Sequence, residues 1–292
     1  KSYPAQAKIQ AIAIDKLRAA GVVLSPIAGV PISIKDLFDV AGEVTTAGSQ
    51  VRKMCAPAIQ DADVVKQLRS AGAIVVGRTN MTEFAFSGLG LNPHYGTPLN
   101  PWDRETSRIP GGSSSGAAIS VSDNMAVAGI GTDTGGSVRI PSALCGLTGF
   151  KPTAARVSML GAFPLSTTLD SIGPLARSVE CCAILDQIMR GESVGLLRDR
   201  PLETLTLAVP QTIVFEDIEE KVANDFNRAL VKISKLGAKI IDIPFNVLSD
   251  IPRANAKGGY AAVEAFGTLR NLLKKDPNSF DPRVAVRIQR GE

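Results

Sequence analysis

The chain of 292 residues is 45% hydrophobic and 21% charged, with a formal net charge of +4. This composition is typical of a soluble globular protein that buries its own core without disulfide or metal staples. No basic run is longer than the Lys274–Lys275 pair and aromatic residues make up only 5%, so no direct nucleic-acid binding is expected.

Apolar spacing in the first half of the chain predicts alternating helices and short strands. In order, these are a helix over Ala5–Ala20, a strand over Val30–Ile34, a helix over Asp61–Ala71, a strand over Ala73–Val76 and a short helix or turn over Thr79–Phe86. Asp61 stands at the N-cap position of its helix. Asn92–Pro110 is rich in Asn, Pro and Gly, which predicts a loop of a length that suggests function.

The second half continues this pattern. It predicts a helix of small residues over Ser114–Val121, a buried strand within Met125–Ile130, a helix over Ser178–Met189 capped by Ser178, a strand over Leu205–Val209, a helix over Glu216–Leu236, a strand over Lys239–Ile243 and a helix over Gly258–Leu273. The alternation indicates an α/β fold with helices on both faces of a sheet. Residues after about Leu196 lack glycine clusters, and we interpret them as scaffold.

The cysteines and termini bear on location. The four cysteines, Cys55, Cys145, Cys181 and Cys182, form no CxxC pair, so we interpret them as free thiols of a reducing compartment. No signal peptide opens the chain and no apolar run is long enough to span a membrane, which favours a cytoplasmic protein without membrane contact.

No metal and no cofactor are expected. The chain begins as if within a helix and ends without a stop signal, so we expect an incomplete chain.

Two clusters rich in glycine and serine flank the strand predicted within Met125–Ile130. They are Gly111–Gly116 (GGSSSG) and Gly131–Ser137 (GTDTGGS). A flexible linker would explain the glycines, but a linker would not carry a buried strand. Two ordinary turns are the simplest alternative. However, Thr134–Ser137 presents successive backbone N–H groups beside a serine hydroxyl, which favours an oxyanion hole.

Phosphate binding is another chemistry typical of such clusters. A Walker loop ends in Gly-Lys-Ser/Thr, and neither cluster contains that lysine. The dinucleotide pattern also fails, because Gly129–Thr134 lacks its third glycine. Ser122–Asn124 spells the SDN triplet of β-lactamases, but the accompanying SxxK and KTG motifs do not occur around it, so we interpret it as chance.

A serine nucleophile in either cluster needs a base. A Ser-His-Asp triad would depend on His94, the only histidine, and a lone loop histidine is more often structural or solvated. Lysine can serve instead where burial lowers its pKa. Lys35 follows the apolar stretch Pro31–Ile34, which makes it the candidate base. The alternative is a lysine at the end of a strand that reaches solvent.

Six separated stretches carry a recognisable pattern. They are GVPISIKD (Gly29–Asp36), GRTNMTEF (Gly77–Phe84), YGTPLNPWD (Tyr95–Asp103), PGGSSSG (Pro110–Gly116), GTDTGGSVRIPSALCGLTGFKPT (Gly131–Thr153) and STTLDSIGPLARSV (Ser166–Val179). In this order they resemble the amidase signature family of serine hydrolases. The resemblance implies a central mixed β-sheet covered by helices on both faces. It also implies a single amidase domain over residues 1–292, with its signature core at about 29–190 and both ends missing.

The family's Ser–cis-Ser–Lys triad, carried over by motif, falls on three residues of this chain. Ser137 is then the nucleophile of an acyl-enzyme, Ser113 the bridging serine after a cis peptide bond, and Lys35 the base. The first cluster reads GGSSSG where GGSSGG is commoner, a change that leaves these residues intact. The resemblance also implies an acyl pocket lined by Ala85–Gly88. The expected oxyanion and substrate-binding groups are Thr134, Gly135, Gly136 and Ser137.

Three residues near the nucleophile are interpreted as structural. Asp133 and Arg139 carry opposite charges and are expected to pair and hold the loop. Cys145 is expected to be a small buried apolar residue.

The resemblance implies an amidase that hydrolyses a small carboxamide substrate. One alternative is the glutaminase (A) subunit of a tRNA-dependent amidotransferase, which would have partner subunits. The other is a non-catalytic pseudo-amidase, which the presence of all three triad residues disfavours. A free-standing amidase could form a homodimer.

Overall fold

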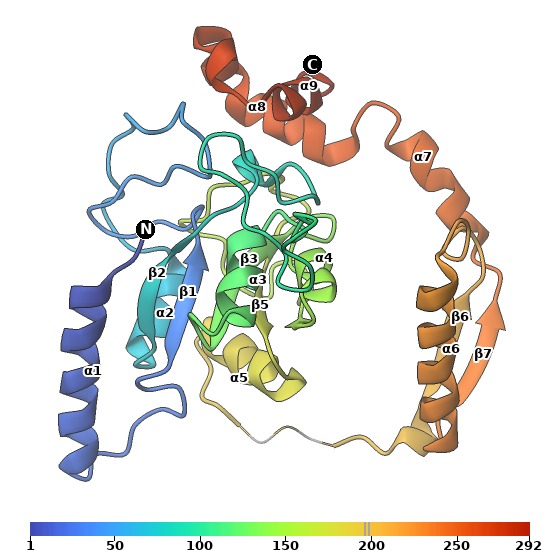
Figure 1. Ribbon diagram of the computed structural model, residues 1–292, viewed down its shortest axis with the longest axis horizontal. Coiled ribbons are helices and arrows are strands. Elements are labelled where there is room, and N and C mark those ends of the chain that lie inside the picture. Colours follow the sequence, from blue (N-terminus) through green and yellow to red (C-terminus); the bar gives the residue numbers. More distant parts are fainter. Residues whose placement is uncertain (196, 198) are drawn as a thin grey trace. The chain divides into compact units, whose positions relative to one another are not determined.

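The computed structural model describes residues 1–195, 197 and 199–292 (Figure 1). The chain forms two compact units. The first comprises Lys1–Gly195 together with Tyr260–Glu292, and the second is the stretch between them. The single domain expected over residues 1–292 stays a prediction.

Among the described residues, five strands form a mixed sheet in the first unit. In spatial order they are β2 (Ile74–Thr79), β1 (Pro31–Lys35), β3 (Ala128–Asp133), β5 (Ser171–Ala176) and β4 (Thr148–Gly149). β1 runs parallel to both of its neighbours, whereas β5 runs antiparallel to β3 and β4. The expected mixed α/β sheet is confirmed. Because β1 and β3 are parallel, their carboxyl ends meet at the same edge of the sheet.

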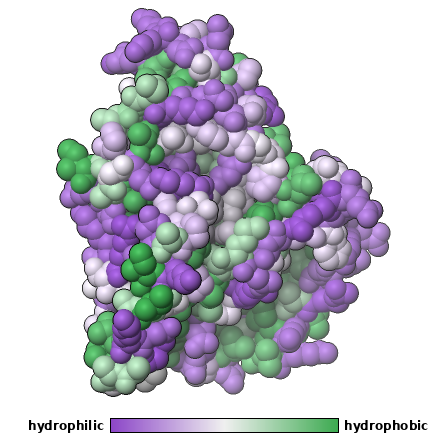
Figure 2. Space-filling model, turned by 60° about the vertical axis from the view of Figure 1, so that its left-hand side comes forward, coloured by the Kyte–Doolittle hydropathy of each residue, from purple (hydrophilic) through white to green (hydrophobic). Residues whose placement is uncertain are grey.

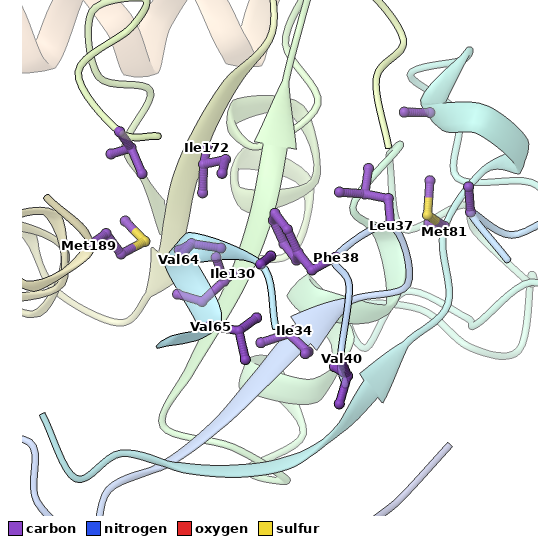
Figure 3. Close-up of a cluster of buried hydrophobic side chains, with 14 of the residues drawn as sticks. Ile34, Leu37, Phe38, Val40, Val64, Val65, Met81, Ile130, Ile172 and Met189 are labelled. Atoms are coloured by element: carbon purple, nitrogen blue, oxygen red, sulfur yellow. The ribbon is translucent and has the colours of Figure 1, made fainter. Parts of the chain in front are cut away.

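One face of this sheet packs against α2 (Asp63–Ser70) and α5 (Val179–Met189). Alternate residues of a strand point to the same face. Ile34 of β1 and Ile130 of β3 point into this core, and each has an exposure of 0%. Figure 3 shows both side chains in the same cluster as Val64 of α2. Full burial of each such side chain contributes about 1.5–3 kcal/mol of hydrophobic stabilisation.

The other face of the sheet carries α3 (Ser115–Ser122). Ser33 points to this face, where its hydroxyl lies 2.7 Å from the hydroxyl of Ser120. α3 and β3 approach very closely, because a Cβ added at Gly129 would lie only 3.0 Å from the Ala117 Cβ. Close approach of this kind requires glycine and other small residues. Helices thus cover both faces of the sheet, as the sequence predicts.

The first unit has further elements outside these two layers. They are α1 (Pro4–Ala19), the 3-10 turn η1 (Glu83–Ala85), α4 (Arg139–Leu144), α8 (Gly259–Lys275), the 3-10 turn η4 (Pro277–Ser279) and α9 (Pro282–Gln289). Ile9 of α1 is 68% exposed. Figure 2 shows hydrophobic residues scattered among hydrophilic ones on the face that is turned forward there. No helix in the described parts of the chain combines the length and the hydrophobicity that a membrane crossing requires.

The second unit contains a parallel strand–helix–strand motif. Its elements are η2 (Leu202–Thr204), β6 (Thr206–Pro210), α6 (Glu220–Lys235), β7 (Lys239–Ile243), η3 (Asn246–Asp250) and α7 (Ile251–Ala254). The expected βαβ rhythm of this stretch is confirmed. Aromatic packing joins the helix to the preceding loop, since the rings of Phe226 and Phe215 lie 5.7 Å apart.

The structure corrects two local predictions. Asp61 does not cap α2; the N-cap residue is Ala62, and the Asp61 carboxylate instead accepts a hydrogen bond from the Ala41 N–H at 2.8 Å. The stretch Met125–Ile130 is not buried throughout, since β3 begins at Ala128 and Met125 is 63% exposed. The residues before Ala128 belong to the turn that follows α3. By contrast, the predicted Ser178 cap of α5 is confirmed.

Candidate active site

The edge of the sheet where β1 and β3 end brings the two glycine clusters and the candidate base together. Lys35 is the last residue of β1, and Asp133 is the last residue of β3. The first cluster, Gly111–Gly116, leads into α3, and the second, Gly131–Ser137, begins within β3 and continues into the loop after it. The Ser114 N–H donates to the Ser137 carbonyl oxygen at 3.3 Å, so the clusters are in contact.

Lys35 is fully buried, with an exposure of 0%. Its amine donates to Ser113 Oγ at 2.7 Å and to Thr132 Oγ1 at 3.0 Å. Burial lowers the pKa of Lys35 to about 7, against the opposing effect of Asp170 and Asp133. The alternative interpretation of Lys35, a strand-end lysine that reaches solvent, is therefore wrong. A lysine with this pKa is substantially neutral at pH 7 and able to accept a proton.

Ser113 is held by backbone contacts as well as by Lys35. The Gly112–Ser113 peptide bond is cis. The Thr82 N–H donates to the Ser113 carbonyl oxygen at 3.1 Å, and the Gly112 N–H donates to the Gly88 carbonyl oxygen at 2.7 Å. Ser113 itself has an exposure of 0%. The hydrogen bond between the Lys35 amine and the Ser113 hydroxyl is therefore shielded from bulk water.

Ser137 is also buried, with an exposure of 6%. Its hydroxyl makes no hydrogen bond to any other residue that the structure describes. The described residues therefore show no hydrogen bond between the hydroxyls of Ser113 and Ser137, and an approach of these two hydroxyls is part of the mechanism proposed below. Lys35, Ser113 and Ser137 nevertheless share one region, because the backbone of Ser114 bonds to that of Ser137.

Asp133 organises the loop that carries Ser137. Its fully buried carboxylate accepts the N–H groups of Gly136 at 2.8 Å, Val138 at 3.1 Å and Arg139 at 3.2 Å. The Arg139 guanidinium adds a two-pronged contact at 3.0 and 2.9 Å. Burial alone would raise the pKa of Asp133, but these hydrogen bonds outweigh burial and hold the pKa below its usual value. The predicted Asp133–Arg139 pair is confirmed.

This pairing changes the set of expected oxyanion donors. The Gly136 N–H is already donated to Asp133, so it is not free for a substrate. The N–H groups of Thr134, Gly135 and Ser137 donate to no other described residue. Gly135 also faces open space, because a Cβ added there would meet no atom within 4 Å. We therefore narrow the proposed oxyanion donors to Thr134, Gly135 and Ser137, with Gly136 as a structural member of the loop.

Asp170 is a site residue that the sequence reasoning did not single out. It is 5% exposed and lies just before β5. One carboxylate oxygen accepts the Thr134 hydroxyl, and the other accepts the N–H groups of Leu165 at 2.9 Å and Ser166 at 3.1 Å. Burial raises the pKa of Asp170, although these hydrogen bonds oppose it. The only signal was its place in the STTLD stretch, which also carries the resemblance.

Two further predicted residues have structural surroundings. His94 Nε2 lies 3.0 Å from Glu83 Oε1, so the imidazole is engaged away from the two candidate serines. The Cys145 thiol donates to the Pro110 carbonyl oxygen at 3.3 Å, and burial raises the pKa of Cys145 to about 11. Cys145 is thus the small buried residue that the sequence predicts, and a thiol with so high a pKa is unreactive.

Comparison with known proteins identifies the family of the chain. The family model Amidase matches residues 1–291, and the chain belongs to the amidase family. It is 37% identical, over 99% of its length, to 2-amino-5-chloromuconic acid deaminase of Comamonas testosteroni, and covers 63% of that protein. It is 41% identical, over 92% of its length, to the A subunit of glutamyl-tRNA(Gln) amidotransferase of Nitratidesulfovibrio vulgaris, and covers 56% of that protein.

Solved structures give the same result at the level of fold. A crystal structure of an amidase superposes on the whole chain with a TM-score of 0.89 and 34% sequence identity. This chain covers 65% of that protein. The chain thus spans 56–65% of the length of these three proteins.

Proposed function

We propose that the protein is an amidase in which Ser137 is the nucleophile, Ser113 the proton relay and Lys35 the base. The observation that supports this most is the buried amine of Lys35, 2.7 Å from the Ser113 hydroxyl and with a pKa lowered to about 7. A base with a pKa near the working pH is the most effective in general base catalysis. Membership of the amidase family supports the same reaction class.

The proposed reaction forms and then hydrolyses an acyl-enzyme. Neutral Lys35 takes the proton of Ser113, which takes the proton of Ser137 as the Ser137 oxygen attacks the amide carbon. The free N–H groups of the loop stabilise the oxyanion, and removal of one such donor typically costs about 3–4 kcal/mol. The C–N bond breaks as the leaving nitrogen receives a proton through Ser113. Water then cleaves the Ser137 ester and releases the carboxylic acid.

A direct test is covalent labelling of the full-length protein with a serine-reactive fluorophosphonate. We expect labelling at Ser137, identified by peptide mass mapping, and none in Ser137→Ala. Hydrolysis of aliphatic, aromatic and amino-acid amides is measured on the same samples. Turnover retained by Ser137→Ala would refute the assignment, and a folded wild type that is neither labelled nor active would favour a pseudo-amidase.

The second candidate function is the glutaminase subunit of an amidotransferase. Its support is that several similar relatives, at 38–41% identity, are named as the A subunit of a glutamyl-tRNA(Gln) amidotransferase. This function predicts glutamine hydrolysis that depends on partner subunits and on charged tRNA. Rapid hydrolysis of simple amides by the protein alone would argue against it. We also propose a cytoplasmic location, which is supported by the four free cysteines because free thiols persist in a reducing compartment.

A further inference from the structure

The buried carboxylate of Glu83 has no part in the mechanism proposed above. Its exposure is 0%. The Ser49 hydroxyl donates to Oε1 at 2.6 Å, and the backbone N–H of Asp281 donates to Oε2 at 2.7 Å. His94 Nε2 lies 3.0 Å from Oε1. Burial raises the pKa of the Glu83 carboxyl, while these three partners oppose that effect.

The three partners of Glu83 come from separate parts of the chain. Ser49 belongs to the loop after β1, His94 to the long loop after η1, and Asp281 to the N-cap of α9. A buried polar group costs free energy unless it is hydrogen-bonded. Here one carboxylate satisfies donors from all three segments, so the position of η1 is fixed by each of them.

The backbone next to Glu83 adopts a conformation that side chains rarely accept. Phe84 and Ala85 have φ angles of 49° and 59°, in the left-handed region. Such residues persist only where surrounding contacts hold them. The Phe84 N–H donates to the Ala47 carbonyl oxygen at 2.9 Å, and its ring lies 5.5 Å from that of Phe280. Glu83, with its three hydrogen-bond partners, directly precedes these two residues in η1.

The same segment, Thr82–Gly88, holds the peptide unit of Ser113 from both sides. The Thr82 N–H bonds to the Ser113 carbonyl oxygen, and the Gly88 carbonyl oxygen accepts the Gly112 N–H. The fit is close, since a Cβ added at Gly112 would lie 3.0 Å from Thr82 Oγ1 and 2.5 Å from the backbone nitrogen of Gly90. A shift of this segment would therefore move Ser113 relative to Lys35.

We propose that Glu83 is a positioning residue for Ser113. Its carboxylate, held by Ser49, His94 and the Asp281 backbone, fixes Thr82–Gly88 and thereby the hydroxyl that faces Lys35. The proposal rests on the proposed function, because it assumes that Ser113 relays the proton. The chain's only histidine then serves to orient a carboxylate rather than to transfer a proton to substrate.

The test compares Glu83→Ala with Glu83→Gln in the full-length protein. The amide that Glu83→Gln introduces can still accept the Asp281 N–H through its oxygen, and its NH₂ can donate to the Ser49 hydroxyl and to a His94 tautomer with an unprotonated Nε2. We expect Glu83→Ala to slow fluorophosphonate labelling of Ser137 at least tenfold and to lower kcat with little change in KM. Glu83→Gln is expected to stay within about threefold of wild type. Leu269→Ala, a core truncation in α8, is the control for general loss of stability and is expected to label at the wild-type rate.

Each outcome bears on the proposal. Folded Glu83→Ala that labels at the wild-type rate would overturn it while leaving the proposed function intact. Equal losses in Glu83→Ala and Leu269→Ala would also overturn it, since the effect would then be one of stability alone. If Glu83→Ala does not fold, Ser49→Ala and His94→Ala each remove one partner, and unchanged labelling in both would refute the proposal. A wild type that is never labelled would remove the proposed function first and this inference with it.

Discussion

The hydroxyl of Thr134, directly after β3, donates a hydrogen bond to the carboxylate of Asp170, directly before β5. These residues lie at the point where the two antiparallel strands leave their ladder. Thr134 begins the loop with the free N–H groups, and Asp170 contributes negative charge near Lys35. One carboxylate thus both restrains the candidate oxyanion loop and influences the base.

Asp170→Asn is expected to shift the pH dependence of kcat/KM. Asp170 opposes the lowering of the Lys35 pKa by burial, so loss of its charge lowers that pKa further. The rise in kcat/KM with pH should then move to lower pH. Thr134→Val is the matched control, since it removes the hydrogen bond but keeps the carboxylate. It should lower kcat without moving the midpoint, and identical profiles for both variants would contradict the electrostatic role.

Lys35→Met should reduce kcat/KM by about 10²–10⁴-fold, the usual contribution of a general base. Lys35→Arg should be equally inactive, because a guanidinium stays protonated in this pH range and cannot accept the proton of Ser113. Steady-state kinetics on an amide that the wild type hydrolyses would measure kcat/KM for both variants. Lys8→Met, a change on the exposed side of α1, provides the control. Substantial activity in Lys35→Arg would show that the lysine is not the base.

The depressed pKa of Lys35 also predicts how stability depends on pH. In the folded protein the amine loses its proton at about pH 7, whereas in the unfolded chain it does so near the ordinary value of 10.5. Between these values the unfolded state binds more protons, so the free energy of unfolding rises with pH. Denaturant unfolding at a series of pH values should show this rise in wild type. A Lys35→Met protein with the same slope would contradict it.

Two glycine substitutions should distinguish an effect on packing and stability from an effect on the reactivity of the candidate site. A Cβ at Gly131 would lie 2.5 Å from Ser114 Oγ, so Gly131→Ala should cost about 1–3 kcal/mol of stability through overpacking. A Cβ at Gly135 meets no atom within 4 Å, so Gly135→Ala should unfold at the wild-type temperature. Its methyl group would stand beside the proposed oxyanion donors and should slow labelling of Ser137. Thermal unfolding and labelling rates together decide between these expectations.

The sequence predicts the elements whose pattern is local. The predicted strand Lys239–Ile243 agrees with β7 at both ends, and the helix predicted over Ser178–Met189 agrees with α5 within one residue. β5 is not among the predicted strands because its sequence, SIGPLA, contains glycine and proline, which argue against a strand. Pro174 is tolerated there because β4, on its outer side, has only two residues and pairs with Leu175 and Ala176.

The residues of the candidate site also divide into those that the sequence predicts and those that it does not. Lys35 and the two serines stand in motifs that can be read one stretch at a time, and the structure brings their segments together. Asp170 and Glu83 could not be assigned, because their roles depend on partners 36 and 198 positions away. Such pairings follow from strand order and helix docking, which composition and periodicity do not encode. The engagement of the Gly136 N–H is unpredictable for a related reason, since its acceptor depends on the shape of the loop.

Two carboxylate contacts link the region of the candidate site to α8 and α9. Glu264 of α8 accepts the hydroxyls of Ser166 and Thr168, in the turn that ends at Asp170, and the Asp281 N–H at the start of α9 reaches Glu83. During synthesis, Lys35, Ser113 and Ser137 leave the ribosome well before these partners exist. A nascent chain released or cleaved before residue 281 would carry every residue of the proposed triad but not both of its supports. The reactive groups are thus synthesised before the contacts that hold the surrounding segments in place.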